Sequence, residues 1–339
     1  MKVSRLLRLW VLVSLCLAAC GHVPTGTAGH AQATPTLDPV QYLNEALDLM
    51  QNNSLHRRTI DWPSFRADVL RQAANAKTPA ETYPYIKIAL SHLNDHHSFF
   101  ISPQDASALN QGTYTTPVPP YVTLVENRFG YVSLPSYAGL NEAAMNQYGT
   151  DLQKQILALD RQQPCGWVVD LRGNGGGNMW PMLVGIGPIL GNGKAGAFVD
   201  ADGNATDWTY QDGKALLGKD VESEVNGEPY SLARQEAPVA VLFGPNTTSS
   251  GEIIALSFVG RPNTRSFGSP SFGDTTGNWT YWLSDQAILE LTTSVDADRT
   301  GKTYGEALLP DVSVPGDNSD AGAVPIEAQQ WLQSQPACR

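Results

Sequence analysis

A serine-rich segment has the residue types of a nucleophile site. Residues 246–254 read NTTSSGEII and follow the apolar run 239–243, so Ser249 and Ser250 lie where a strand ends and a helix begins. A serine hydroxyl at such a junction can be exposed, and the next N–H points from the positive end of the helix toward a developing oxyanion. The alternative is a plain helix N-cap, which is the commonest role of a serine hydroxyl at a helix start.

A glycine-rich turn is the second candidate. Residues 170–178 read DLRGNGGGN and follow the apolar run 167–169. Glycines there permit positive φ and let backbone N–H groups converge on an anion. The segment lacks the Lys-Ser/Thr ending of a nucleotide-binding loop and the spacing of a dinucleotide fingerprint. It is therefore either a set of N–H donors or a tight turn without chemistry.

A histidine pair is the third candidate. Residues 93–100 read LNDHHSFF, in which His96 and His97 are adjacent and must point in different directions. No cysteine lies nearby and no His-x-x-x-His spacing occurs, so we predict no metal site. A histidine flanked by a carboxylate and a hydroxyl, here Asp95 and Ser98, is a reasonable general base, although a structural or surface role is commoner for a single histidine.

Length and composition indicate an ordinary globular protein. The chain has 339 residues, of which 42% are hydrophobic and 16% charged, which excludes disordered and coiled-coil proteins. This length predicts two folded units, or one large α/β unit with a helical appendage. The formal net charge is −11, and no dense run of Lys or Arg occurs beyond the N-terminus, so nucleic acid is excluded as a partner.

Periodicity divides the chain into two kinds of structure. Helical spacing of apolar residues from 38 to 93 predicts a small helical N-terminal unit over 37–110. Beyond the proline-rich stretch 116–120, short apolar runs alternate with helical patterns, which predicts an α/β layer fold over 120–315. The expected strands are 129–134, 167–171 and 239–243, and the expected helices are 141–159 and 250–259.

Three further segments complete this division. Residues 279–283 and 287–293 flank a Ser-Asp-Gln turn and predict a hairpin. Residues 201–236 are polar and glycine-rich, and we interpret them as a long insertion or a small hairpin. Residues 316–339 form a C-terminal tail.

The N-terminus has the pattern of a secretion signal. A positively charged start precedes the apolar run 9–17, which is too short to cross a bilayer comfortably, so residues 1–19 are predicted to be a signal peptide. The run ends in LAAC, which is typical of a bacterial lipoprotein box with Cys20 lipidated; cleavage after the small-x-small residues 31–33 is the alternative. Residues 20–36 then form a flexible tether. We expect a lipid-anchored, extracytoplasmic protein of the bacterial cell envelope.

Cysteine usage follows from this interpretation. Cys16 leaves with the signal and Cys20 carries lipid, so Cys165 and Cys338 remain as one pair in an oxidising compartment. They form either a disulfide or two unpaired thiols.

Four blocks together resemble a known family. Residues 131–134 (YVSL), 170–177, 248–252 (TSSGE) and 309–312 (LPDV) resemble the carboxy-terminal processing (tail-specific) serine peptidases and the related tricorn protease core. The resemblance covers roughly residues 38–315. It implies an α/β fold with a ClpP/crotonase-like core and a small helical N-terminal unit, and it implies that Ser249 is the nucleophile.

The chain departs from the processing branch of that family in two ways. That branch uses a lysine base about two dozen residues after the serine, but here Asp274 stands in its place and no lysine occurs between Lys219 and Lys302. The branch also inserts a PDZ domain, whereas only about thirty residues separate Ser98 from Phe129.

The tricorn-like branch uses a histidine from an upstream Asp-x-His-Ser/Thr block. The resemblance implies that His97 is the base and that Glu306 is its acidic partner. Asp274 or Asp95 are the alternatives for orienting the histidine. Ser98 is expected to help set the tautomer of the imidazole.

The resulting hypothesis is a serine peptidase that needs no cofactor. His97 accepts the proton of Ser249 as the hydroxyl attacks a peptide carbonyl. The oxyanion is held by the N–H of Ser250 and by one from the glycine turn, Gly176 first and Gly175 next. The partner is a peptide or protein substrate. The alternative from another class is a catalytically silent, envelope-anchored binding module on the same fold.

Overall fold

The N-terminal part of the fold is helical. The structure is a computed structural model that describes residues 37–111, 118–314 and 323–339, so the predicted signal, tether and Cys20 lie outside the described residues. Asp38 caps the first helix by accepting the N–H of Gln41 at 2.8 Å. Pro84 lies in the first turn of the helix that begins at Tyr83, where the missing N–H of proline costs no helix hydrogen bond. The helices are α1 (Pro39–Asn53), α2 (Trp62–Gln72), η1 (Pro79–Thr82) and α3 (Tyr83–Ser91).

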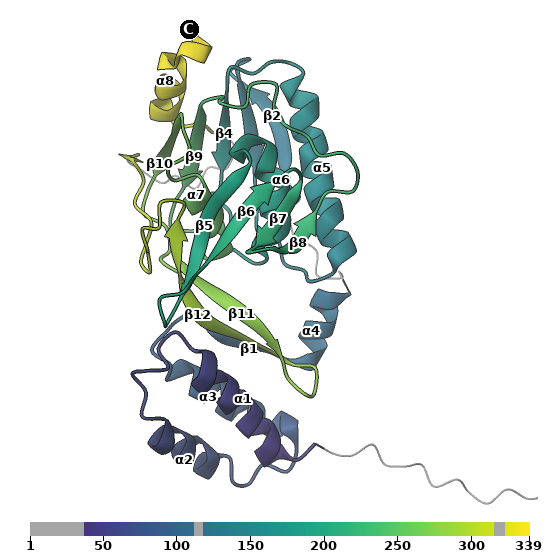
Figure 1. The fold of residues 1–339 in the computed structure, drawn as a ribbon, viewed down its shortest axis with the longest axis vertical. Coiled ribbons are helices and arrows are strands. Elements are labelled where there is room, and N and C mark those ends of the chain that lie inside the picture. The colour runs from purple at the N-terminus through teal and green to yellow at the C-terminus, as the bar shows by residue number, and fades with distance from the viewer. Residues whose placement is uncertain (1–36, 112–117, 315–322) are drawn as a thin grey trace, which may run out of the picture. The chain divides into compact units, whose positions relative to one another are not determined.

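The helices pack on a β-hairpin from the far end of the chain. This hairpin consists of β11 (Thr276–Trp282) and β12 (Ile288–Asp298), and its Leu289 and Leu291 are fully buried in the same apolar cluster as helix residues such as Leu47. Figure 1 shows the hairpin running between these helices and the remaining strands. The helical unit therefore owes part of its core to residues more than two hundred positions later in the chain.

A six-stranded sheet forms the centre of the molecule. Its order is β13-β10-β9-β4-β3-β2, and all neighbours are parallel except β2 with β3. The central strands are buried throughout, as expected for parallel strands covered on both faces. The bounds are β2 (Tyr121–Val125), β3 (Phe129–Ser133), β4 (Gly166–Asp170), β9 (Val239–Phe243), β10 (Thr264–Gly268) and β13 (Val312–Ser313).

A second, seven-stranded sheet has the order β1-β12-β5-β6-β7-β8, with β11 paired to β12. Residues 201–236, predicted to be an insertion or a small hairpin, supply the antiparallel strands β6 to β8 of this sheet. The bounds are β1 (Phe99–Ile101), β5 (Gly193–Asp200), β6 (Ala205–Gln211), β7 (Lys214–Leu217) and β8 (Asp220–Glu224).

Helices join the two sheets. Helix α6 is almost entirely buried and shares one apolar cluster with strands of both sheets, among them Val169 and Trp208. Gly185 lets α6 approach α5 closely, because a Cβ there would lie 2.7 Å from the Leu152 side chain. No described helix has the length and apolar content needed to cross a membrane. The remaining helices are α4 (Pro103–Asn110), α5 (Glu142–Asp160), α6 (Met179–Leu190), α7 (Ser250–Ser257), α8 (Ile326–Ser334) and η2 (Pro336–Cys338).

The C-terminal segment is tied to the central sheet. Cys165, directly before β4, and Cys338 form a disulfide with a Cα–Cα distance of 5.0 Å, which is the pairing predicted from the cysteine usage. Leu332 of α8 is buried in one apolar cluster with Cys338 and with side chains of the central sheet. Residues 323–339, which belong to the segment predicted as a tail, therefore complete part of the core.

Candidate active site

A serine and a histidine from distant segments meet at the end of β9. Ser249 precedes α7, and His97 lies in the loop between α3 and β1. The Nε2 atom of His97 is 2.7 Å from the Oγ of Ser249, although 152 positions separate the two residues. The hydroxyl is therefore in hydrogen-bond contact with an imidazole, which is the arrangement that general-base activation requires.

The backbone of Ser249 is strained. Its φ of 54° and ψ of −122° lie in a region that residues with a Cβ rarely adopt, at a cost of roughly 1–3 kcal/mol. The Glu252 carboxylate compensates by accepting the Ser249 N–H at 2.8 Å. Ser249 is the N-cap residue of α7 and forms a capping box with Glu252, and its hydroxyl also contacts His97, so the N-cap role and the contact with the imidazole coexist.

The Glu252 carboxylate connects the serine to a second loop. Its Oε1 accepts the Ser271 hydroxyl at 2.5 Å and the Gly273 N–H at 2.9 Å, and its Oε2 also accepts the Asp274 N–H at 2.9 Å. Burial raises the pKa of Glu252, and the bonds from Ser271, Gly273 and Ser249 oppose that rise. Residues 271–274 are thereby held against the serine loop.

The second nitrogen of the imidazole contacts a threonine. His97 Nδ1 lies 2.8 Å from Thr276 Oγ1 at the start of β11. When Nδ1 carries the proton and donates it to Thr276, the lone pair of Nε2 faces the Ser249 hydroxyl. Two backbone contacts fix the segment: the His97 N–H donates to Asp95 Oδ1 at 3.1 Å, and the His97 carbonyl accepts Asn278 Nδ2 at 2.7 Å.

The residues expected to orient the histidine have other contacts. Glu306 has an exposed side chain, and only its carbonyl takes part here, accepting the Thr275 hydroxyl at 2.7 Å. The carboxylate of Asp95 holds the backbone, and the Ser98 hydroxyl donates to Asp95 Oδ2 at 3.0 Å. Among the described residues, the structure brings neither Glu306 nor Ser98 to the imidazole of His97.

Thr276 is the residue that sequence reasoning missed. It is the second of two adjacent threonines, and nothing in the sequence distinguishes Thr276 from Thr275. Within 271–277 the sequence distinguishes only Asp274, which stands where the processing branch has a lysine base. The contact depends on the start of β11, which the sequence pattern does not define.

The electrostatic environment keeps His97 neutral. Burial lowers the pKa of His97 below its usual value, while the carboxylates of Asp274 and Asp95 raise it and reverse part of that effect. Because burial is the largest of these influences, the ring is unprotonated at neutral pH and can accept a proton.

The glycine turn lies against the serine loop. Gly176 has φ +92°, and a Cβ there would lie 2.8 Å from the Thr248 carbonyl oxygen and 2.9 Å from the Ser249 Cβ. Only glycine fits so close to the serine. The Ser250 hydroxyl donates to the Gly177 carbonyl at 2.6 Å and ties the turn to α7.

The predicted oxyanion donors differ in availability. The Ser250 N–H, in the first turn of α7, has no acceptor among the residues that the structure describes. The Gly176 N–H donates to Asn174 Oδ1 at 3.0 Å, and the Gly175 N–H donates to Ser136 Oγ at 2.7 Å. Both predicted glycine donors are therefore engaged within the protein.

Asn174 connects three loops at this point. Its Nδ2 donates to the Leu134 carbonyl at 3.0 Å, and its own carbonyl accepts the Thr248 N–H at 3.0 Å. The residue is fully buried, so these bonds are shielded from water. The sequence pattern predicts only a turn at Asn174.

A second buried carboxyl group lies near Glu252. Asp296 on β12 is fully buried, and neither of its oxygens has a hydrogen-bond partner among the described residues. Burial and the negative charge of Glu252 raise the pKa of Asp296 well above its usual value. Both influences favour the neutral form of this carboxyl group.

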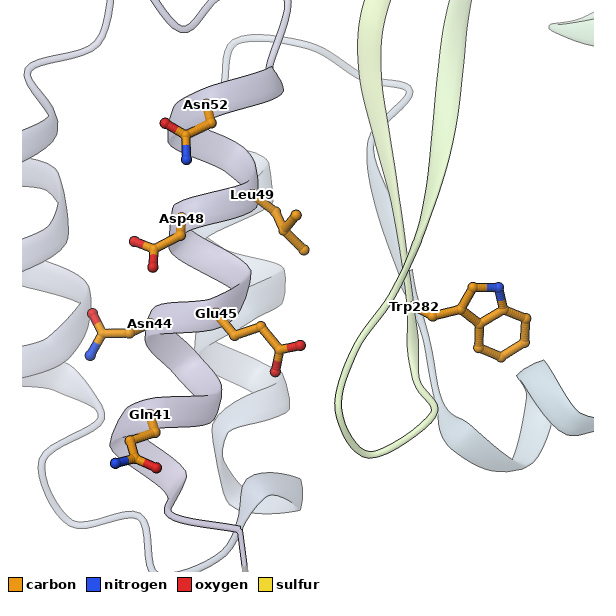
Figure 2. A pocket seen from close by; sticks show the side chains of 7 residues that line it. All are labelled: Gln41, Asn44, Glu45, Asp48, Leu49, Asn52 and Trp282. Carbon is orange, nitrogen blue, oxygen red and sulfur yellow. The ribbon is translucent and has the colours of Figure 1, made fainter.

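An open groove elsewhere in the molecule is lined by acidic side chains that already have partners within the protein. It has a volume of about 540 Å³ and lies along α1, with Trp282 at the hairpin (Figure 2). Glu45 accepts the Ser284 hydroxyl at 2.6 Å, and Asp48 pairs with Arg66 at 2.6 Å. None of the residues lining the groove belongs to the serine-histidine site.

No group of three or more His, Cys, Asp or Glu side chains among the described residues is arranged to hold a metal ion.

Comparison with known proteins yields both a family and neighbours. Residues 128–314 match the family described as Peptidase family S41. The chain is 30% identical over 298 residues to the nisin-resistance protein of Lactococcus lactis subsp. lactis, covering 88% of each chain. A solved lipoprotein from Streptococcus agalactiae superimposes with a TM-score of 0.73 at 26% identity, covering 88% of this chain and 97% of that one.

A further neighbour bears on the fold alone. The photosystem II D1 C-terminal processing protease superimposes with a TM-score of 0.58 at 16% identity, covering 82% of this chain and 94% of that one. The α/β architecture with a small helical N-terminal unit is therefore that of the S41 peptidase fold.

The burial of His97 predicts the direction in which its pKa is shifted. We expect the pKa of His97, followed by NMR of the imidazole ring, to lie below 6.5, the usual value for histidine. Asp274→Asn removes a nearby negative charge that favours the imidazolium, so it should lower the pKa further. Asp212→Asn, which alters an exposed carboxylate on another loop, is the control and should leave the His97 titration unchanged. A wild-type pKa above 6.5 would contradict the dominance of burial.

Proposed function

Because the chain belongs to peptidase family S41, we propose that it is a serine peptidase with Ser249 as the nucleophile and His97 as the general base. The observation that carries this proposal is the 2.7 Å contact between Ser249 Oγ and His97 Nε2. The strained backbone of Ser249 adds support, because strain of this kind concentrates at functional sites.

The proposed chemistry begins with transfer of the Ser249 proton to His97 Nε2 as Oγ attacks the peptide carbonyl carbon. The imidazolium that forms donates through Nδ1 to Thr276 and lies in the field of the Asp274 and Asp95 carboxylates, which favours the charged ring. His97 then returns the proton to the leaving amine. Water, activated by the same imidazole, hydrolyses the acyl-enzyme.

The oxyanion requires donors near Ser249. The free Ser250 N–H at the start of α7 is the first, and we propose the Gly176 N–H as the second. The Gly176 N–H must then exchange Asn174 Oδ1 for the oxyanion as the substrate reacts. Losing one such donor typically costs ~3 kcal/mol of transition-state stabilisation.

We also propose where the enzyme works and on what. Lipidation at Cys20 would anchor it at the bacterial cell envelope with the folded part outside the cytoplasm, and the neighbour described as a lipoprotein supports this location. The substrate is a peptide or protein. A relative named for nisin resistance makes nisin a reasonable first peptide to test.

A second candidate is a binding module on the same scaffold that does not turn over substrate. The observation that favours it is the engagement of both predicted glycine donors by Asn174 and Ser136. The two functions differ in whether Ser249 reacts.

Covalent labelling distinguishes them. We expect a fluorophosphonate probe to label Ser249, as identified by mass spectrometry, and we expect the wild-type protein to cleave nisin or an unstructured peptide. Because His97 accepts the serine proton, His97→Ala should abolish detectable labelling, and Ser249→Ala should lower hydrolysis by a factor of about a thousand or more.

His96→Ala is the matched control, because His96 is exposed and adjacent to His97 in the sequence, and it should label normally. A folded wild-type protein that is never labelled, and whose peptide binding is unaffected by Ser249→Ala, would favour the binding module.

The orienting residue can be tested separately. Thr276→Val removes the Nδ1 partner while keeping the shape of the side chain, so kcat/KM should fall about ten-fold or more, whereas Thr276→Ser should stay within about three-fold of wild type. Glu306→Gln should retain activity because its side chain is exposed. Loss of peptide hydrolysis in Glu306→Gln with unchanged Thr276→Val would reverse this assignment.

The anchor makes a prediction about location. Cys20→Ser should move the protein from the membrane fraction to the soluble fraction of expressing cells, because acyl chains supply the membrane affinity. Cys16→Ser, within the predicted signal, is the control and should leave the mature protein in the membrane fraction. Membrane association that survives Cys20→Ser would argue against lipidation at this residue.

A further inference from the structure

The strand that leads away from His97 has a free edge. Among the described residues, β11 pairs with β12 and with no other strand. Figure 1 shows β11 next to β12 in the hairpin below the central strands. A free strand edge presents unpaired N–H and C=O groups, which can pair with another extended chain.

The register identifies which groups face outward. The Leu283 N–H donates to the Ala287 carbonyl at 2.9 Å, so these two residues form a hydrogen-bonded pair. Hydrogen-bonded and non-bonded pairs alternate along an antiparallel ladder. Trp279 and Tyr281 therefore direct their backbone groups toward β12.

The intervening residues of β11 face the other way. Asn278, Thr280 and Trp282 direct their backbone N–H and C=O groups away from β12. Thr292, opposite Asn278, is consistent with this parity, because its N–H and carbonyl bond Ser98 and Leu55 instead of β11. No described backbone group pairs with the outward groups of β11.

This free edge is continuous with the serine-histidine pair. Thr276, the first residue of β11, contacts His97 Nδ1 at 2.8 Å, and Asn278 donates to the His97 carbonyl at 2.7 Å. A chain lying along β11 would thus run directly to the reacting atoms.

Exposed apolar side chains flank the same path. Trp279 on β11 is 50% exposed, and Phe272 is 63% exposed. The Phe272 N–H donates to the Thr247 carbonyl at 3.0 Å, so Phe272 lies beside the loop that carries Ser249. Both side chains are available for contact with a chain that lies along β11.

We propose that the substrate binds as an extended polypeptide strand added to the outer edge of β11, with Trp279 contacting one of its apolar side chains. This inference rests on the proposed function and specifies its substrate class. Main-chain hydrogen bonds to Asn278, Thr280 and Trp282 provide affinity that is independent of sequence, and alternate side chains of the substrate provide selectivity. Unfolded or flexible segments can bind in this way, whereas the same sequence inside a folded domain cannot.

The test blocks one outward donor in the full-length protein. Thr280→Pro removes an N–H that faces away from β12, which an edge strand tolerates, and Thr280→Ala is the control for loss of the side chain. We expect Thr280→Pro to lower kcat/KM for an unfolded protein substrate, reduced and carboxymethylated casein, about ten-fold or more, chiefly through KM. Thr280→Ala keeps the N–H and loses only the hydroxyl bond to Glu290, so it should lower kcat/KM for casein clearly less than Thr280→Pro. A larger loss in casein cleavage than in fluorophosphonate labelling places the defect in binding along the edge.

A second measurement covers the case in which Thr280→Pro does not fold. Single N-methyl groups placed along a cleaved peptide should weaken its binding to the wild-type protein with a period of two residues, because alternate amides face β11. A uniform or absent effect of N-methylation would overturn the proposal, as would a folded Thr280→Pro variant that cleaves casein normally. A wild-type dimer dispersed by Thr280→Pro with unchanged cleavage would show that a second copy occupies the edge, which also overturns it.

The proposed function can fail separately. If the fluorophosphonate does not label wild-type Ser249, the peptidase proposal fails. Strand addition to β11 is then tested by measuring the binding of a fluorescent casein peptide through its anisotropy. Weaker binding to Thr280→Pro than to Thr280→Ala would still support strand addition, and equal binding would overturn it.

Discussion

The hydrogen bonds of one buried carboxylate, that of Glu252, determine where the serine lies. A buried charge without partners would be strongly unfavourable, and here donors from Ser249, Ser271, Gly273 and Asp274 satisfy it. These contacts offset the cost of positive φ at Ser249. They also hold the loop that continues into β11, so the same group indirectly positions the partner of the imidazole.

The serine and histidine illustrate what a sequence can reveal about a site. The strand-to-helix junction indicates Ser249 or Ser250, and the carboxylate and hydroxyl neighbours indicate His96 or His97, but only the family resemblance selects Ser249 and His97. Their contact required no knowledge of side-chain packing beyond that resemblance. Thr276 could not be found in this way, because its contact depends on where β11 begins and on the bulge between Gly277 and Asn278. The direction of a side chain is likewise not readable from the sequence, and Glu306, which the resemblance implies as the acidic partner, has an exposed side chain in the structure.

The fold shows the same division between strong and weak patterns. Buried parallel strands such as β4 and β9 are continuous apolar runs and were predicted directly. Strands β6 to β8 mix polar and apolar residues and are joined by tight turns, so their sequence resembles an insertion. Their place in the seven-stranded sheet comes from pairing with β5 and from packing on α6, which are contacts between segments distant in sequence. Similarly, the sequence indicates only a turn at Asn174, because its hydrogen bonds to two other loops depend on the fold.

The bridge between Cys165 and Cys338 has a consequence for biogenesis. It joins residues 173 positions apart, one directly before a central strand and the other in the last described segment. Ribosomes release a chain from its N-terminal end, so β4 has emerged long before its covalent partner exists. The disulfide can form only after the whole intervening chain is available in an oxidising compartment. Completion of the sheet's outer layer is thereby coupled to the presence of the entire polypeptide under oxidising conditions.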